Sequence, residues 1–322
     1  MAADVLSTLL RSVRIAGSLQ FCVQAGGDWQ TDGTPRLGGL ARSALPTIPF
    51  HVVADGECWL RVQQQRYALQ AGDVVAFPFA TGHALGRGEG GPLICPVDDL
   101  PPRPWAEVPV LRYGQGPATT RLLCGFVSLE AMNFQPLREA LPSVMQLHAG
   151  APGAGPLLHG AVQALVAEAQ SGSPGGSSVV ERLTEILLIE LLRSEIVARQ
   201  GAAPNLLAGM GDPIVARTLA VIHDRPREPW TVASLARAGA TSRSVLSERF
   251  AALLGKSPMR YLREWRLFLA GSALVHTRRP IGHIAQEAGY DTEASFSRAF
   301  SRLHGMPPAR WRLQARRDGA AG

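Results

Sequence analysis

Two histidines and four cysteines carry the most distinctive chemistry in the N-terminal half of the sequence. His51, His83 and a thiolate from Cys58 or Cys95 form a donor set that suits a soft divalent ion such as zinc. The alternative is that each histidine only satisfies a buried hydrogen bond, as isolated histidines in β-structure commonly do. The sequence leaves both roles open.

The four cysteines, Cys22, Cys58, Cys95 and Cys124, form no Cys-x-x-Cys pair. In a reducing compartment a structural disulfide is not expected. The thiols are therefore either small buried apolar groups or targets of an oxidant signal, for which Cys22 and Cys95 near strand ends and turns are the candidates. Ligand binding is the favoured interpretation, because no cysteine has an evident cationic activator in the sequence.

The elements that must position these residues are short strands. From Leu19 to about Phe126, apolar runs are separated by Gly, Pro and Asp-Gly signals, which predicts an all-β domain in the form of a small barrel. Asp55-Gly56 predicts a two-residue hairpin that pairs His51 with Leu60. His51 and Cys58 would then share one face, while Glu57 would point to the other.

The last third of the chain has a different pattern. In Ile281–Arg312 a short helix breaks at Gly289 and a second helix follows from Thr292 to about Leu303, which is the order of a helix-turn-helix motif. A similar pattern occurs fifty residues earlier. The residues that coincide at this offset are Ala238/Ala288, Gly239/Gly289, Ser247/Ser297, Phe250/Phe300, Leu253/Leu303, Gly255/Gly305 and Pro258/Pro308.

One long helix joins the two copies. Ser257-Pro258 is a helix start, and the apolar period continues to about Thr277. Roughly twenty residues at 1.5 Å per residue span about 30 Å. This length is close to the ~34 Å between successive major-groove faces on one side of a duplex. The sequence thus predicts that one chain reads two adjacent grooves.

This arrangement, with GYDTEASFSRAFSRLHGMPPARW, resembles the AraC/XylS family of bacterial transcriptional regulators over about Asp212–Arg316. The resemblance implies base contacts from the N-terminal parts of the two reading helices. The implied positions are Arg243, Ser244, Ser247, Glu248, Glu293, Ala294, Ser295 and Arg298. Arg298 is the strongest candidate because its guanidinium can bind guanine O6 and N7 together, whereas Arg302 is expected to contact phosphate.

In the N-terminal half, AGDVVAFPFATGH resembles the second sequence motif of the cupin barrel, with His51 at the start of the first motif. Metal-binding cupins have another histidine two residues later, and this chain has Val53 there. The resemblance therefore implies a cupin-like barrel with an incomplete metal set. The expected fold is multidomain: a cupin-like β-barrel, a helical dimerisation and linker segment, and an all-α domain with two helix-turn-helix motifs.

We expect domain boundaries near residues 150 and 204, giving a sensor domain (1–150), a helical segment (151–204) and a DNA-binding domain (205–322). The charge divides in the same way: residues 205–322 hold eighteen Lys and Arg against nine Asp and Glu, whereas residues 1–204 hold fourteen against seventeen. A basic C-terminal half suits phosphate binding. Helices predicted at Pro156–Gln170 and Ser177–Gln200 either mediate a homodimer or pack on the chain's own barrel.

These features indicate a cytoplasmic transcription regulator that binds double-stranded DNA, answers a small-molecule or oxidant signal and contacts RNA polymerase. No signal-peptide pattern and no long apolar run are present, so no membrane association is expected. The alternatives are a metal-dependent cupin enzyme with a regulatory tail, and a DNA-binding protein whose β-domain only dimerises. No catalytic triad, Walker loop or dinucleotide motif occurs.

Overall fold

The computed structural model describes residues 4–11, 14–32, 46–103, 105, 107–148, 156–171, 173–198 and 204–320. The chain forms two compact units, which we describe separately. The first consists of Met1–Arg14, Glu130–Ala140 and Ile196–Gly322, and the second of Ile15–Leu129 and Leu141–Glu195.

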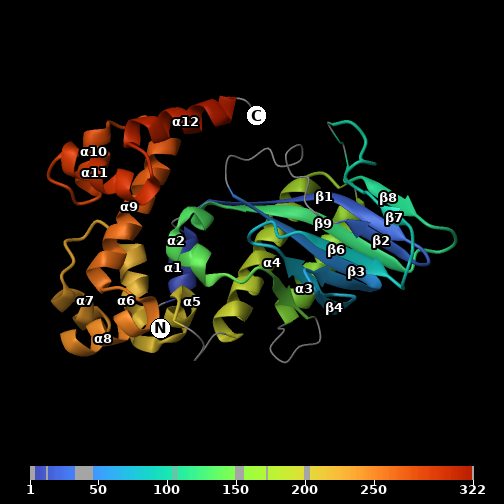
Figure 1. The fold of residues 1–322 in the computed structure, drawn as a ribbon, viewed down its shortest axis with the longest axis horizontal. Helices are drawn as coiled ribbons and strands as arrows, with labels where there is room; N and C mark the ends of the chain where they lie inside the picture. Colours follow the sequence, from blue (N-terminus) through green and yellow to red (C-terminus); the bar gives the residue numbers. More distant parts are fainter. Residues whose placement is uncertain are drawn as a thin grey trace. The chain divides into compact units, whose positions relative to one another are not determined.

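The second unit is a nearly closed β-barrel built on three long strands that lie side by side (Figure 1). Strand β3 pairs with β9, and β9 pairs with β1, both antiparallel. The strands are β1 (Ile15–Ala25), β2 (Trp29–Asp32), β3 (Thr47–Val62), β4 (Gln65–Gln70), β5 (Val74–Ala76), β6 (His83–Arg87), β7 (Leu93–Ile94), β8 (Val110–Tyr113), β9 (Thr120–Leu129) and β10 (Met145–Leu147). The prediction of a cupin-like barrel is confirmed.

The hairpin expected at Asp55-Gly56 is wrong. Strand β3 continues through these residues, and its pairing with β9 shifts register between Val53 and Asp55. The shift is a bulge at Ala54, and Gly56, at φ 74°, still pairs with Thr120 of β9, so the strand does not turn back here. The hairpin turn lies eight residues later, at Gln63-Gln64 between Val62 and Gln65. As a result, His51 faces β9 and β5, and not Leu60.

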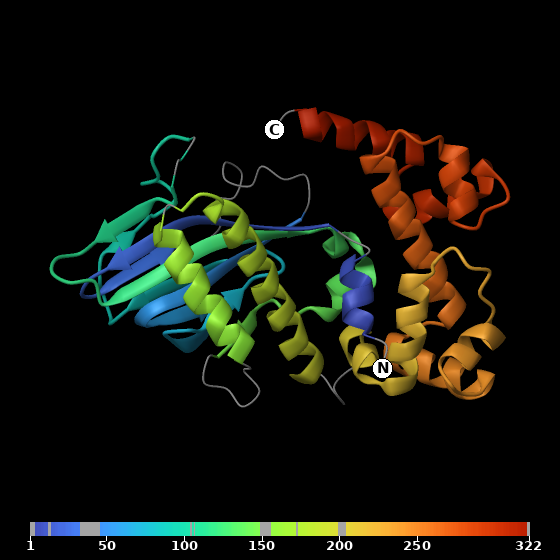
Figure 2. The same ribbon diagram turned by 180° about the vertical axis from the view of Figure 1, so that it is seen from behind.

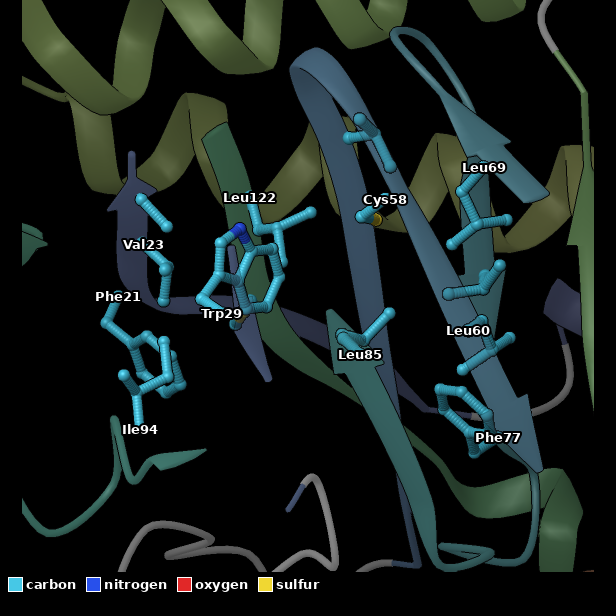
Figure 3. Packing of buried hydrophobic residues seen from close by; sticks show 14 of the residues in the cluster. Phe21, Val23, Trp29, Cys58, Leu60, Leu69, Phe77, Leu85, Ile94 and Leu122 are labelled. Carbon is cyan, nitrogen blue, oxygen red and sulfur yellow. The ribbon is translucent and has the colours of Figure 1, made fainter. Parts of the chain in front are cut away.

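The barrel interior is packed with side chains from nearly every strand (Figure 3). Trp29, Leu60 and Leu85 are at most 1% exposed. Cys58 belongs to this core, where its thiol is one more small apolar group. Burial of large aliphatic and aromatic groups, each contributing about 1.5–3 kcal/mol, stabilises the barrel.

Helices α3 (Pro156–Ser171) and α4 (Gly176–Ala198) run side by side along one face of this barrel (Figure 2). Both helices were predicted. The contact is close where α4 meets β1: a Cβ added at Gly17 would lie 1.6 Å from Thr184 Oγ1. Packing on the chain's own barrel therefore accounts for the buried stripe of α4, which is Val180, Thr184, Leu187, Leu188, Leu191 and Leu192.

The first unit is helical. Its elements are α1 (Val5–Arg11), η2 (Glu130–Asn133), α2 (Gln135–Ala140), α5 (Leu206–Gly211), α6 (Pro213–Asp224), α7 (Val232–Ala238), α8 (Arg243–Leu254), α9 (Pro258–His276), α10 (Ile281–Glu287), α11 (Glu293–His304) and α12 (Pro308–Ala320). Helix α9 joins the α7–α8 pair to the α10–α11 pair (Figure 1). Ser257 caps α9 through Arg260 N–H, as the Ser-Pro start predicts. The two helix-turn-helix motifs are confirmed.

The turns inside the two motifs differ from the expected alignment. Gly289 takes a positive φ of 83°, as predicted, but its sequence counterpart Gly239 is at −74°. In the first motif Ala240 occupies the left-handed conformation, at φ 52°. The left-handed residue therefore lies one position earlier in the second motif, and two residues separate it from the N-cap Thr292, whereas one residue separates Ala240 from the N-cap Ser242. Gly239 has another role, because a Cβ there would lie 2.8 Å from Thr218 Oγ1.

Two segments distant in sequence pack among these helices. Helix α1 packs on α6. Phe134, beside α2, contacts an aromatic cluster on α9, with ring centroids 5.0 Å from Trp265 and 5.3 Å from Phe268. No helix of the described residues is long and apolar enough to cross a membrane.

Candidate functional site

A chain of hydrogen bonds joins three side chains on the barrel wall. His51 Nδ1 lies 3.1 Å from Cys124 Sγ, and His51 Nε2 lies 2.9 Å from His83 Nε2. His83 Nδ1 lies 2.8 Å from the carbonyl oxygen of Thr81. The register produces the first contact, because His51 of β3 stands directly opposite Cys124 of β9.

The chemistry of the groups fixes the position of each proton. A carbonyl oxygen only accepts, so His83 Nδ1 carries a proton that it donates to Thr81. In the neutral ring His83 Nε2 is then an acceptor, and His51 donates to it from Nε2. His51 Nδ1 is left as an acceptor for the thiol of Cys124. Each of these three side chains thus makes its hydrogen bonds in its neutral form.

Burial keeps these groups neutral. It lowers the pKa of His51 well below its usual value, and the neighbouring His83 lowers it further. The pKa of His83 is also lowered by burial, against the opposing effects of the Thr81 carbonyl and Asp32. Burial raises the pKa of the Cys124 thiol well above its ordinary value. At neutral pH this site therefore presents a thiol and two neutral imidazoles.

The hydrogen-bonded side chains face a cavity of about 150 Å³ inside the barrel. His51, His83 and Cys124 line one part of it. Apolar side chains form most of the remaining wall: Phe21, Val23, Trp29, Leu85, Leu93, Ile94, Val97, Leu122 and Phe126. The cavity suits a small and mainly apolar guest: burial would strip a charged guest of its hydration, and the exposed carboxylates Asp32 and Asp98 in the lining would repel an anion.

The expected zinc ligands do not converge on one point. The two ring nitrogens of His51 diverge, one toward Cys124 and the other toward His83. One ion therefore cannot bind Cys124 together with the Nε2 atoms of His51 and His83. Among the described residues, no group of three His, Cys, Asp or Glu side chains has the geometry to hold a metal ion. The donor set does not fit a cupin metal centre.

The other predicted residues are distributed differently. Cys95 lines the cavity and is half-buried, whereas Cys58 lies in the core, where burial raises its pKa to about 12. Burial raises the pKa of Cys22 to about 11, although Arg121 and Arg112 oppose the shift. Cys124 is the group that sequence reasoning missed. The β3–β9 register identifies it, but His51 and Cys124 are 73 residues apart in the sequence, so no local signal predicts that register.

The DNA-facing candidates lie at the start of α8 and along α11. Most are exposed: Arg243, Ser244, Glu248, Glu293, Ala294, Arg298 and Arg302. Ser247 and Ser295 are half-buried. The hydroxyl of Ser295 is already engaged in the helix cap, since it donates to the Thr292 carbonyl at 2.8 Å. Arg298 and Arg302 are the exposed cations of this helix.

The apolar residue Val245 lies on the same exposed surface of α8. Its side chain is 38% exposed beside Ser244, whereas the next residue, Leu246, is fully buried. An apolar group on this surface can contact a thymine methyl. The spacing of apolar residues in α8 does not predict the exposure of Val245, because these residues are distributed around the helix with little net asymmetry.

Comparison with known proteins identifies this combination of barrel and reading helices. A cupin family model matches residues 4–196, and a helix-turn-helix domain model matches residues 235–314. A putative AraC-like transcription regulator of Streptomyces antibioticus is 33% identical over 96% of this chain and 98% of its own length. The chain belongs to the AraC family of transcription regulators.

Two further matches show the extent of the similarity. An RCS-specific transcriptional activator of Escherichia coli, RclR, is 25% identical over 97% of this chain and 98% of its own length. The solved DNA-binding domain of AdpA in complex with a target DNA is 26% identical, covering 34% of this chain and 99% of that one, with a TM-score of 0.32. As an AraC-family regulator, the protein binds DNA through its helix-turn-helix domain.

Proposed function

We propose that the barrel cavity of this AraC-family regulator is its sensor site, and that it takes an uncharged, mainly apolar small molecule. The cavity carries the proposal: most of its lining is apolar, and His51, His83 and Cys124 in its wall form a neutral chain of hydrogen bonds. Occupancy would be read out as a change in transcription at the bound promoter.

Two other barrel functions compete with this one. Oxidation at Cys95 or Cys22 is favoured by the half-buried position of Cys95 in the cavity wall and by the likeness to an RCS-specific activator. A metal-dependent enzyme is disfavoured because no group of three His, Cys, Asp or Glu side chains among the described residues could hold a metal ion. Because the relatives are transcription regulators, we propose that the barrel binds its ligand without turnover.

We propose that α8 and α11 enter adjacent major grooves. Helix α9, which joins them, has 19 residues and so extends about 28 Å, close to one helical turn of DNA. Arg298 reads a guanine and Arg302 contacts phosphate. Arg243, Ser244, Val245 and Glu248 present a shorter and more neutral surface, which supports weaker or water-mediated reading by α8.

We also propose a homodimer formed through the α3–α4 layer. Although α4 packs on its own barrel, Leu157, Val179 and Val197 on these two helices remain 45–67% exposed. A second copy would cover these side chains and double the DNA contacts. In function we assign residues 1–150 to sensing, 151–204 to dimerisation and 205–322 to DNA and RNA polymerase, in the cytoplasm.

The sensor role is tested by blocking the cavity. Val97→Phe fills space in the cavity wall, and Val110→Phe makes the same change on β8, away from the lining. Each protein is screened by thermal melting against a panel of small neutral apolar compounds, and hits are tested in a promoter–reporter strain. We expect wild type and Val110→Phe to respond and Val97→Phe to lose both responses. Equal responses in all three would contradict the proposal.

The dimer is tested separately by light scattering. Val197→Asp combined with Val179→Asp should shift the protein to monomer, whereas Leu313→Asp, an equally exposed position on α12, should not. A wild-type protein that is monomeric at micromolar concentration would contradict the dimer and leave the sensor proposal intact.

A further inference from the structure

Cys124 has three features that no other cysteine among the described residues has together. Its thiol donates to an imidazole nitrogen, it lies in the wall of a cavity, and that imidazole is held in place by a second histidine. Cys58 is buried without a place in the cavity lining. Cys22 has only a long contact of 3.9 Å from Sγ to the Val23 carbonyl.

The arrangement has the logic of a nucleophile, a base and a group that orients the base. His51 Nδ1 is free of a proton and faces the thiol. His83 Nε2 accepts a hydrogen bond from His51 Nε2–H on the far side of the His51 ring. This bond fixes the tautomer of His51 in which Nδ1 carries no proton. The Thr81 carbonyl fixes His83 in turn. A cavity that only encloses its ligand does not require a base beside a thiol and a second group that orients this base.

We propose that Cys124 captures a small, uncharged, apolar electrophile covalently inside the barrel, with His51 as its base. The proposal rests on the sensing role of the cavity and specifies its chemistry. The ligand class is an α,β-unsaturated carbonyl compound. A saturated ligand of the same shape would occupy the cavity without forming a bond.

The reaction is an addition with no leaving group. Cys124 Sγ bonds to the β-carbon as the C=C π bond breaks, and the thiol proton passes to His51 Nδ1. That proton then returns to the α-carbon of the enolate, which restores the neutral ring. One S–C bond and one C–H bond form, one S–H bond and one π bond are lost, and no oxidant is required. His83 Nε2 stabilises the transient imidazolium of His51 by accepting a hydrogen bond from its Nε2–H.

The surroundings select the electrophile. Because burial raises the pKa of Cys124, the free thiolate is scarce at neutral pH and reaction in the absence of His51 is slow. The apolar wall, including Phe21, Trp29 and Leu122, disfavours charged reagents. A reagent must therefore be small and neutral to reach the thiol, and must lie beside His51 when it does.

The test compares cyclohexenone with cyclohexanone on the full-length protein. Binding of both is followed by thermal melting, and bond formation by intact mass and peptide mapping at neutral pH. We expect both to raise the melting temperature and only cyclohexenone to add, once per chain and at Cys124. Cys58→Ala should label like wild type, and Cys124→Ser should bind cyclohexanone without labelling.

His51→Gln tests the base. This variant should bind cyclohexanone and add cyclohexenone at least ten times more slowly. Its rate should rise about tenfold per pH unit, since it depends on free thiolate, whereas the wild-type rate should change much less. That difference in pH profile is not expected from a structural role alone.

The outcomes separate the two proposals. If both ketones bind and neither adds, or if the adduct lies on Cys22 or Cys95, covalent capture at Cys124 is wrong and the cavity remains a sensor site. If cyclohexenone adds to Cys124 at the same rate in His51→Gln, the role of the base is wrong. If neither ketone binds and neither adds, the covalent proposal fails, and the sensor proposal loses this ligand class.

Discussion

His276 Nε2 lies 3.2 Å from Glu130 Oε1 at the C-terminal end of α9. Glu130 is only 5% exposed, and its other carboxylate oxygen accepts from the backbone N–H of Arg14 at 3.1 Å. The residue directly follows β9, the strand that carries Cys124. One buried carboxylate thus joins the end of α9 to Arg14 within the helical unit.

Loss of this carboxylate should destabilise the helical unit. Glu130→Ala removes a buried carboxylate that accepts from the Arg14 N–H and lies beside His276, so we expect the free energy of unfolding to fall by about 1–3 kcal/mol. Glu139→Ala, on the same segment but exposed, should change it by less than about 0.5 kcal/mol. Urea unfolding followed by tryptophan fluorescence measures both. Equal effects would contradict the role assigned to Glu130.

The contact between β1 and α4 should be sensitive to one methyl group. Gly17→Ala places a Cβ 1.6 Å from Thr184 Oγ1 and 2.9 Å from the Glu181 carbonyl, so α4 must shift. We expect a loss of several degrees in melting temperature. Gly160→Ala on α3, where a Cβ meets nothing within 4 Å, should be neutral or stabilising. Thr184→Ala should partly rescue Gly17→Ala, and failure to rescue would show that the clash lies elsewhere.

Acid should destabilise the helical unit through His223. This residue is 1% exposed, and its Nε2 lies 2.8 Å from the Tyr261 hydroxyl. Burial lowers its pKa to about 3 from an unfolded value near 6.5, so its contribution is complete above pH 6.5 and declines as pH falls toward 3. Between pH 7 and pH 5 we expect a loss of about 2 kcal/mol. Urea titrations at these pH values should show a shallower dependence in His223→Gln, and an unchanged one would refute the assignment.

Substitution of Arg298 and substitution of Arg302 should change DNA binding in different ways. Arg298→Ala should cost about 1–3 kcal/mol at the cognate site and relax the preference at one base pair. Arg302→Ala should weaken binding to all sequences alike and reduce the salt dependence by about one phosphate contact. Binding to a panel of single-base variants at several salt concentrations distinguishes them. An Arg298→Ala protein with unchanged base preference would exclude Arg298 as a base reader.

The sequence by itself determined the elements whose signals are local. Ser242, Ser257 and Thr292 each cap the helix that follows, and the apolar positions Phe250, Phe296 and Phe300 are fully buried as their spacing predicts. Such signals act within one or two helical turns, so a short stretch of chain contains the whole cause. The motif repeat added the arrangement of two reading helices.

Tertiary structure decided what depends on register and on distant contacts. Asp55-Gly56 has the composition of a hairpin turn, but both residues pair with β9 as part of a continuous strand, and the pairing of the same two strands places His51 opposite Cys124. An Asp-Gly pair satisfies the backbone demands of either structure, so the choice belongs to the partner strand. In the same way, Phe134 and α1 join the helical unit because α9 and α6 offer complementary apolar surfaces far away in sequence. Local propensity contains no information about such partners.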